Sequence, residues 1–316
     1  MKSTLTFGIV APSGFVNDPA ALERASRWLA DRGHRVVVDE AALLREQRFA
    51  GTDDERLASL HRMFRREDVD IVMAARGGYG LARLLERIDY ALLAESGKLF
   101  AGHSDCTALQ LAMWAQARTP SLAGPIACFD FGGDPATAVS EFTARSFWTA
   151  LDSAPLRIDV AQPGQPACVA SGTLWGGNLC TLAHLVGTPW FPDVDGGILF
   201  LEDIYEHPYR IERMLLQLHY AGVLERQAAV LLGSFNGYRL LDNDNGYDLD
   251  AAIQLIRSKT RTPILAGLPF GHMRDKVSLA IGAMATVSSP PTRPVDGGDG
   301  WELTITPPDY PWRALQ

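Results

Sequence analysis

Short apolar segments and longer amphipathic segments alternate along the first part of the chain. The apolar segments are rich in β-branched and aromatic residues, as buried strands are, whereas the amphipathic segments place apolar residues at helical spacing. The strand-like segments are residues 5–12, 34–40, 69–78 and 98–104, and the helix-like segments are residues 19–33, 53–67, 79–88 and 105–117. This alternation predicts a doubly wound parallel sheet of the flavodoxin or Rossmann type, with helices on both faces. We assign this N-terminal α/β domain to residues 1–150.

The alternation weakens after about residue 135. Residues 156–172 are punctuated by proline and glycine, and we interpret them as the link to a second unit. The strand-like segments of that unit are residues 196–204, 228–235, 278–289 and 301–308, and its helix-like segments include residues 208–222 and 248–259. The sequence therefore predicts a smaller C-terminal α/β domain, which we assign to residues 151–316.

The composition restricts the classes of partner. The 316 residues carry a formal net charge of −8 and no basic stripe, so we expect no nucleic-acid binding. No apolar run is long enough to cross a bilayer and the N-terminus lacks the pattern of a secretory signal, so we expect a cytoplasmic protein without membrane contact. The four cysteines, at positions 106, 128, 168 and 180, have no C-x-x-C spacing and are expected to be buried, reduced thiols.

Ser104 lies where a strand-like segment passes into a helix-like one. The carboxyl ends of parallel strands are where ligands bind in doubly wound sheets, so a serine there is a candidate nucleophile. The glycine-rich residues 76–80 lie at a second such end. Serine at a strand-to-helix junction is nevertheless a common helix cap, and from this segment alone capping is the better interpretation.

A serine nucleophile needs a histidine base and a group that orients the base. Of the seven histidines, His207 and His272 remain after the others are assigned to solvated or core positions. His272 follows an apolar strand-like run and a glycine, which is typical of the mouth of a site. Glu202 and Asp203 end another strand, where a buried carboxylate needs a partner. Only one of them can face the histidine; alternation does not choose between them, although Asp203 better suits a cap of the following helix.

The glycine-rich residues 76–80 could be taken for a nucleotide-binding loop, and the segments that combine histidine with acidic residues could be taken for a metal site. The glycines can aim backbone N–H groups at an anion, as an oxyanion hole requires, or form a plain tight turn, and the residues leave both open. The segment lacks the signatures of nucleotide-binding loops. Neither residues 103–105 nor residues 202–207 have the spacing of a zinc site, so no metal is expected.

Six segments, in order, carry a resemblance to a known family. They are residues 11–14 (APSG), 76–80 (RGGYG), 102–110 (GHSDCTALQ), 172–182 (GTLWGGNLCTL), 187–218 and 267–272 (GLPFGH). Over nearly its whole length the chain resembles the LD-carboxypeptidases, a family of serine peptidases. The resemblance implies a catalytic triad of Ser104, Glu202 and His272 and no cofactor.

The resemblance also implies an oxyanion hole formed by the backbone N–H groups of Gly78 and Asp105. An exopeptidase must hold a free carboxylate, and we expect Arg76, Gly77 and Asn178 to contact the substrate. The implied partner is a small peptide, and the implied assembly is a homodimer.

Three functions remain open from the sequence. The first is a serine LD-carboxypeptidase that releases terminal D-alanine from murein tetrapeptides during muropeptide recycling. The second is an immunity-type peptidase of the same family that cleaves peptidyl-nucleotide antibiotics with the same triad. The third is a two-domain protein that binds a small molecule without catalysis.

Overall fold

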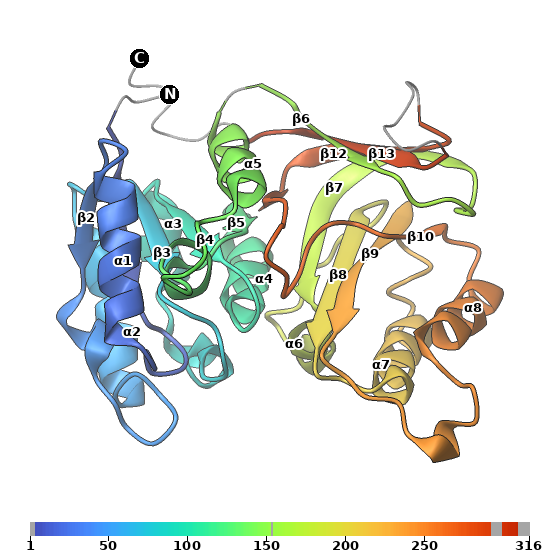
Figure 1. Ribbon diagram of the computed structural model, residues 1–316, viewed down its shortest axis with the longest axis horizontal. Coiled ribbons are helices and arrows are strands. Elements are labelled where there is room, and N and C mark those ends of the chain that lie inside the picture. The colour runs from blue at the N-terminus through green and yellow to red at the C-terminus, as the bar shows by residue number, and fades with distance from the viewer. Residues whose placement is uncertain (1–3, 153, 292–298, 309–316) are drawn as a thin grey trace.

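Two β-sheets with helices packed on them make up the computed structural model, which describes residues 4–152, 154–291 and 299–308 (Figure 1). The strands of the first sheet run in the order β11-β5-β4-β3-β1-β2. Their bounds are β1 Thr6–Val10, β2 Arg35–Val38, β3 Ile71–Ala74, β4 Leu99–Gly102, β5 Ser121–Ala123 and β11 Leu279–Ile281. Strands β1 to β5 pair in parallel, and β11 joins the edge strand β5 antiparallel. The order of the five parallel strands is that of flavodoxin-like sheets.

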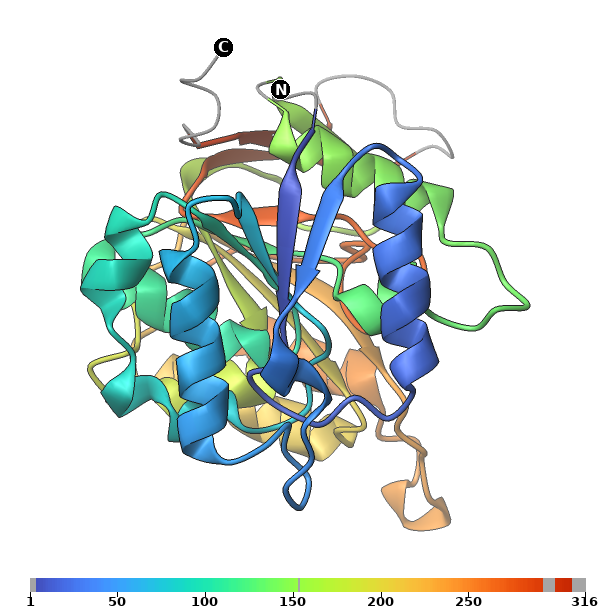
Figure 2. The same ribbon diagram turned by 90° about the vertical axis from the view of Figure 1, so that its left-hand side faces the viewer.

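Helices cover both faces of this first sheet, as the alternation predicts. Its principal helices are α1 Pro19–Ala30, α2 Asp53–Arg65, α3 Tyr90–Glu95, α4 Cys106–Ala117 and α5 Glu141–Leu151. Helices α1 and α2 lie on opposite sides of the sheet (Figure 2). The helix expected over residues 79–88 forms only two short 3₁₀ turns, Leu81–Arg83 and Leu85–Arg87. The backbone of Gly80 has a φ of 156°, outside the helical range, which prevents a regular helix from starting there.

The second sheet is mixed, with the strand order β10-β9-β8-β7-β12-β13-β6. Its strands are β6 Leu156–Val160, β7 Cys168–Asn178, β8 Ile198–Ile204, β9 Ala229–Asn236, β10 Ile264–Ala266, β12 Met284–Ser289 and β13 Trp301–Thr306. Strands β7 to β10 pair in parallel, and β12, β13 and β6 pair antiparallel. Its helices are α6 Leu179–Leu185, α7 Pro208–Tyr220 and α8 Leu249–Lys259. Two sheets with helices confirm the predicted α/β class.

Two segments differ from the sequence-based expectation in this part of the chain. Residues 156–172 form strand β6 and the start of β7, with the prolines and glycine in the turn between them, rather than a plain link. The run 278–289 is divided into β11 and β12 at Gly282, which has a φ of 89° and packs against the ring of Trp114. The run therefore contributes one strand to each sheet. The boundary between residues 150 and 151 stays a prediction.

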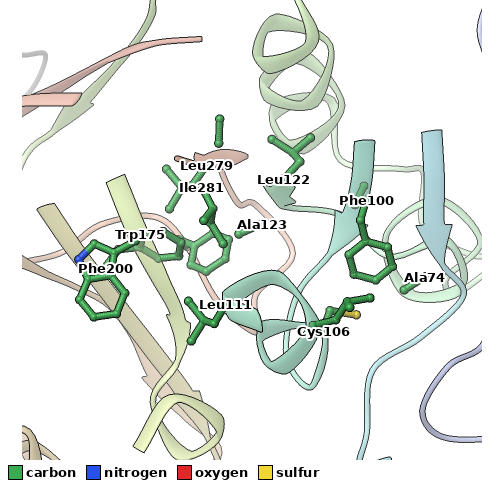
Figure 3. Close-up of a cluster of buried hydrophobic side chains, with 14 of the residues drawn as sticks. Ala74, Phe100, Cys106, Leu111, Leu122, Ala123, Trp175, Phe200, Leu279 and Ile281 are labelled. Atoms are coloured by element: carbon green, nitrogen blue, oxygen red, sulfur yellow. The ribbon is translucent and has the colours of Figure 1, made fainter. Parts of the chain in front are cut away.

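Helix α4 lies between the two sheets and brings their carboxyl ends together (Figure 1). Residues 106–113 of this helix are all buried, so this part of the helix is enclosed around its whole circumference. In Figure 3, Leu111 lies on the side of α4 that faces Trp175 and Phe200 of the second sheet, and Cys106 lies on the side that faces Phe100 of the first. This packing sets the end of β4 opposite the end of β8. No helix in the described ranges is both long and apolar enough to span a membrane.

Candidate active site

Ser104, His272 and Glu202 form one chain of hydrogen bonds between the two sheets. The Oγ of Ser104 lies 3.0 Å from Nε2 of His272, and Nδ1 of His272 lies 2.8 Å from Oε2 of Glu202. Ser104 follows β4, Glu202 lies in β8, and His272 lies in the loop that joins β10 to β11. Because Glu202 is fully buried and can only accept from an imidazole N–H, its contact favours the tautomer with hydrogen on Nδ1. That tautomer leaves Nε2 free to accept the proton of Ser104.

Ser104 occupies a strained turn and does not cap helix α4. Its φ of 65° lies in the left-handed region, which costs a non-glycine residue on the order of 1–3 kcal/mol. The residue at the N-cap position is Asp105, whose side chain makes no capping hydrogen bond. Gly77 makes this turn possible, because a Cβ at position 77 would lie 2.8 Å from Cβ of Ser104. The structure therefore gives Gly77 a steric function beside the serine, where we expected a contact with substrate.

Asn178 contacts Glu202, and every hydrogen-bonding group of the Asn178 side-chain amide has a partner within the protein. Its Nδ2 donates to Oε1 of Glu202 at 3.2 Å and to Oδ1 of Asp203 at 2.9 Å. Its Oδ1 accepts from the backbone N–H and the hydroxyl of Thr181. Through these bonds Asn178 caps the N-terminus of helix α6. An amide has two donor hydrogens and two acceptor lone pairs, so none is left for a ligand. In this structure the Asn178 side chain positions Glu202, and its predicted contact with substrate stays a prediction.

Asp203 points away from His272 and caps a different helix from the one expected. Its Oδ2 accepts from the backbone N–H of Cys180, in the first turn of α6, at 2.8 Å. The following helix, α7, is instead capped by His207. Burial and the neighbouring Glu202 raise the pKa of Asp203 to about 6.

We expect Asp203 to reduce the stability of the folded protein as the pH rises from about 4 to 6. Its pKa rises from 3.8 to about 6 on folding, so the folded state binds the proton more tightly than the unfolded state in this range. Deprotonation therefore costs folding free energy, and Asp203→Asn removes that cost. Melting temperatures measured from pH 4 to pH 7 should rise in the variant relative to the wild type as the pH increases. A difference that stays constant with pH would contradict the expectation.

The loop around His272 is fixed from several sides. Gly271 has a φ of 132°, and a Cβ there would lie 3.0 Å from Oε2 of Glu202. The backbone carbonyl of His272 accepts from Nδ2 of Asn236 at 2.9 Å. The other candidate histidine, His207, lies with its Nε2 3.0 Å from Oδ2 of Asp244, and it is not part of the Ser104 chain.

A buried polar group supports the face of His272, and sequence reasoning missed it. The ring of His103 packs edge-to-face on the ring of His272, with 5.2 Å between centroids. Its Nδ1 lies 2.9 Å from the carbonyl oxygen of Gly124, so Nδ1 is the donor. Burial, with a smaller contribution from Lys276, holds the pKa of His103 well below its usual range. Lys276 itself is fully buried and paired with Asp130 at 2.5 Å.

The backbone N–H groups of Gly78 and Asp105 lie in the two loops that flank Ser104. Gly78 has a φ of 111°. Within the described part of the chain, neither N–H donates a hydrogen bond to another protein group. The side chain of Asp105 accepts from the Ser13 hydroxyl at 2.6 Å and from the backbone N–H of Leu81 at 2.9 Å. Burial raises the pKa of this Asp105 carboxyl.

Arg76 is the cation nearest in sequence to these glycines. It is half-buried, and its Nη1 donates to the carbonyl of Phe15 and to Oδ1 of Asn17, each at 2.8 Å. In the ranges that the structure describes, no acidic side chain pairs with its guanidinium. A Cβ at Gly78 would lie 3.5 Å from Nη2 of Arg76, so this charge lies beside the Gly78 backbone.

The cysteines differ from their predicted burial. Cys106 is buried, but Cys128 and Cys168 are partly exposed and Cys180 is exposed; all four are free thiols. Cys180 lies in the first turn of α6, just beyond the end of β7. Among the residues described, no group of three or more histidine, cysteine, aspartate or glutamate side chains is arranged to hold a metal ion.

Comparison with known proteins places these residues in a family. Residues 7–124 match the LD-carboxypeptidase N-terminal domain and residues 171–287 match the LD-carboxypeptidase C-terminal domain. A probable murein peptide carboxypeptidase of Bacillus subtilis is 34% identical over 90% of this chain and 89% of its own.

Solved structures give the same result. The crystal structure of muramoyltetrapeptide carboxypeptidase from Oxalobacter formigenes is 43% identical, with a TM-score of 0.87, over 97% of this chain and 99% of that chain. The structure of MccF in complex with glutamyl sulfamoyl guanosine shares the fold at 21% identity, with a TM-score of 0.85 over 98% of each chain. The chain belongs to the LD-carboxypeptidase family.

Proposed function

We propose that this protein is a serine-type LD-carboxypeptidase that releases the terminal D-alanine from murein tetrapeptides. The observation that carries the proposal is the hydrogen-bonded chain from Ser104 through His272 to the buried Glu202. Two relatives, at 34% and 43% identity over nearly the whole chain, are described as murein peptide and muramoyltetrapeptide carboxypeptidases. The serine mechanism, the cytoplasmic location and the homodimer remain predictions from the sequence.

In this mechanism His272 is the general base. Its Nε2 takes the proton of Ser104 as the hydroxyl oxygen attacks the carbonyl carbon of the L-D peptide bond. The Glu202 carboxylate stabilises the imidazolium that forms. The tetrahedral oxyanion accepts hydrogen bonds from the N–H groups of Gly78 and Asp105. His272 then protonates the leaving D-alanine nitrogen, and a water activated by the same histidine hydrolyses the acyl-enzyme.

We assign recognition of the terminal carboxylate to Arg76. A carboxypeptidase must bind that carboxylate next to the scissile bond. Nε and Nη1 of Arg76 donate to the loop, and Nη2, which has no partner among the described residues, can donate charge-assisted hydrogen bonds to the carboxylate. Two features support Arg76: its place beside Gly78 and the absence of an acidic partner in the described ranges. Gly77, which packs against the Ser104 side chain, would then lie next to the reacting carbonyl group of the substrate.

The other two functions are less well supported. The likeness to MccF, at 21% identity, is a likeness of fold. A protein that only binds a small molecule has no use for a strained serine bonded to a histidine–carboxylate pair.

A single comparison of substrates tests the proposal. The protein is incubated with a murein tetrapeptide that ends in D-alanine and, separately, with an aminoacyl sulfamoyl adenylate, and the products are identified by mass spectrometry. We expect loss of one alanine from the tetrapeptide and much slower cleavage of the adenylate. Cleavage of the adenylate alone would favour the immunity-type function. Cleavage of neither, with no labelling of Ser104 by a fluorophosphonate, would favour a binding protein.

A further inference from the structure

Two loops near Ser104, residues 11–14 and residues 76–81, are hydrogen-bonded to each other. Both are also bonded to the same two buried side chains. We call residues 11–14 the first loop and residues 76–81, which contain Gly78, the second loop. The backbone N–H of Gly14 donates to the carbonyl of Gly77 at 3.3 Å, which joins the loops. The charges are those of Arg56, from helix α2, and Asp105, from the turn after Ser104.

Arg56 binds carbonyl groups of both loops. The residue is only 1% exposed. Its Nη1 donates to the carbonyl oxygen of Pro12 at 2.6 Å and to that of Gly80 at 3.1 Å, and its Nη2 pairs with Asp53. An arginine is almost never fully buried unless its charge and donors are used. Here Nη1 satisfies loop carbonyls that would otherwise be buried without partners, whereas the buried Nε has no hydrogen-bond partner among the described residues.

Asp105 binds donors of the same two loops. Its carboxylate accepts from the hydroxyl of Ser13 and from the backbone N–H of Leu81. The carbonyl of Gly80 and the N–H of Leu81 are the two ends of one peptide group. That single peptide is therefore held at its oxygen by Arg56 and at its nitrogen by Asp105. Little room exists for it to shift, because a Cβ at Gly80 would lie 2.7 Å from Nη1 of Arg56.

We propose that Arg56 is a positioning residue that fixes the Gly78 N–H relative to the Asp105 N–H, so that both point at one oxyanion. The two proposed donors lie on separate segments, and the clamped Gly80–Leu81 peptide is the rigid connection between them. Removing the guanidinium releases the oxygen end of that peptide and lets the second loop move. A hydrogen bond to an oxyanion weakens steeply when its donor is misaligned, so the effect falls on the transition state. The inference rests on the proposed serine mechanism.

The test compares Arg56→Met and Arg56→Lys with Arg62→Met. Arg62 lies on the same helix and forms an ion pair with Asp39 at 2.7 Å. The readouts are kcat and KM for D-alanine release, the rate of labelling of Ser104 by a fluorophosphonate, and the melting temperature. The labelling reaction also places an oxygen in the oxyanion hole, but it needs no peptide substrate.

We expect Arg56→Met to lower kcat and the labelling rate by about 10- to 100-fold, less than the loss of a whole oxyanion donor, with KM changed less than about threefold. Arg56→Lys should recover part of both rates, because an ammonium still donates to one of the two carbonyls. Arg62→Met should lower the melting temperature and leave both rates near the wild-type values.

Two results would overturn the inference. One is a folded Arg56→Met protein with wild-type kcat and labelling rate. The other, if Arg56→Met does not fold, is an Arg56→Lys protein whose two rates equal those of the wild type. Failure of the wild type to release D-alanine, with labelling that still depends on Arg56, would refute the proposed substrate and leave the inference intact.

Discussion

Replacing Ser104 with alanine should lower the rate of D-alanine release by on the order of 10⁴-fold or more, because removal of the nucleophile leaves only the oxyanion hole and substrate binding. The fold should survive, since the Ser104 hydroxyl bonds to no side chain but His272 within the described ranges and does not cap helix α4. Single-turnover assays on a murein tetrapeptide, with a melting curve for each protein, measure both effects.

Cys106→Ala is the matched control for this variant. Cys106 is two residues from Ser104 and is the other potential nucleophile of the same turn. Burial, reinforced by the Asp105 charge, raises the pKa of its thiol, so it stays neutral and unreactive. We expect near wild-type kcat with some loss of stability from the small cavity. A Cys106→Ala protein as inactive as Ser104→Ala, or an active Ser104→Ala protein, would show that Ser104 is not the nucleophile.

Replacing Glu202 with glutamine should cost about 10³- to 10⁴-fold in kcat, with a smaller effect on KM. The reason lies in Asn178, whose Nδ2 donates to Oε1 of Glu202. One Nδ2 hydrogen of Asn178 is bound by Asp203, and the other keeps an acceptor only if the glutamine oxygen faces Asn178. The glutamine NH₂ then faces Nδ1 of His272. His272 must then accept at Nδ1 and carry its proton on Nε2, the tautomer that cannot take a proton from Ser104.

Asp203→Asn is the control, since it changes the adjacent carboxylate in the same way. Asp203 bonds to helix α6 and not to His272, so we expect kcat within a few-fold of wild type. Asparagine caps a helix about as well as aspartate, so the change in stability should follow the pH dependence given by the raised pKa of Asp203. Steady-state kinetics of both variants decide the assignment. A nearly normal Glu202→Gln protein beside an inactive Asp203→Asn protein would reverse the roles of the two carboxylates.

The sequence predicts the first sheet well because its pattern is local, whereas the triad is implied by the resemblance and stays a prediction. Alternating apolar and amphipathic segments imply parallel strands, and parallel strands bring their carboxyl ends to one edge. Ser104 and His272 each follow an apolar run, and the resemblance selects Glu202 over Asp203. The structure places these three side chains in hydrogen-bond contact.

The supporting charges were harder to predict because their partners are distant in sequence. Arg56 follows three acidic residues, a pattern typical of a solvent-exposed helix start. It is nevertheless in helical phase with the buried residues Leu60 and Met63. A cation on the apolar face of a helix is a signal that could have revealed it. Lys276 and Asp130 carry no comparable signal, since their pairing requires the folded chain.

The helix that Asp203 caps could not be predicted from the local sequence, because it depends on the pairing of strands β7 and β8. Strands β7 and β8 pair in parallel, with Asn178 opposite Glu202. The helix that follows β7 therefore begins beside the end of β8. A carboxylate at that end caps the earlier helix rather than its own successor, and the amide before that helix reaches back to the carboxylates.

Strand β11 has a consequence for the order in which the protein matures during synthesis. It pairs with β5 of the first sheet, although it follows nearly all of the second sheet in the chain. Until the ribosome has released residues 279–281, the edge of β5 has no partner and can pair with another nascent chain. The His272 loop is anchored by β10 on the second sheet and by β11 on the first, so the β5–β11 pairing helps to hold the proposed base beside Ser104. A chain that stops before residue 272 therefore holds the serine without the proposed base, and one that stops before residue 279 lacks the strand that ties the His272 loop to the first sheet.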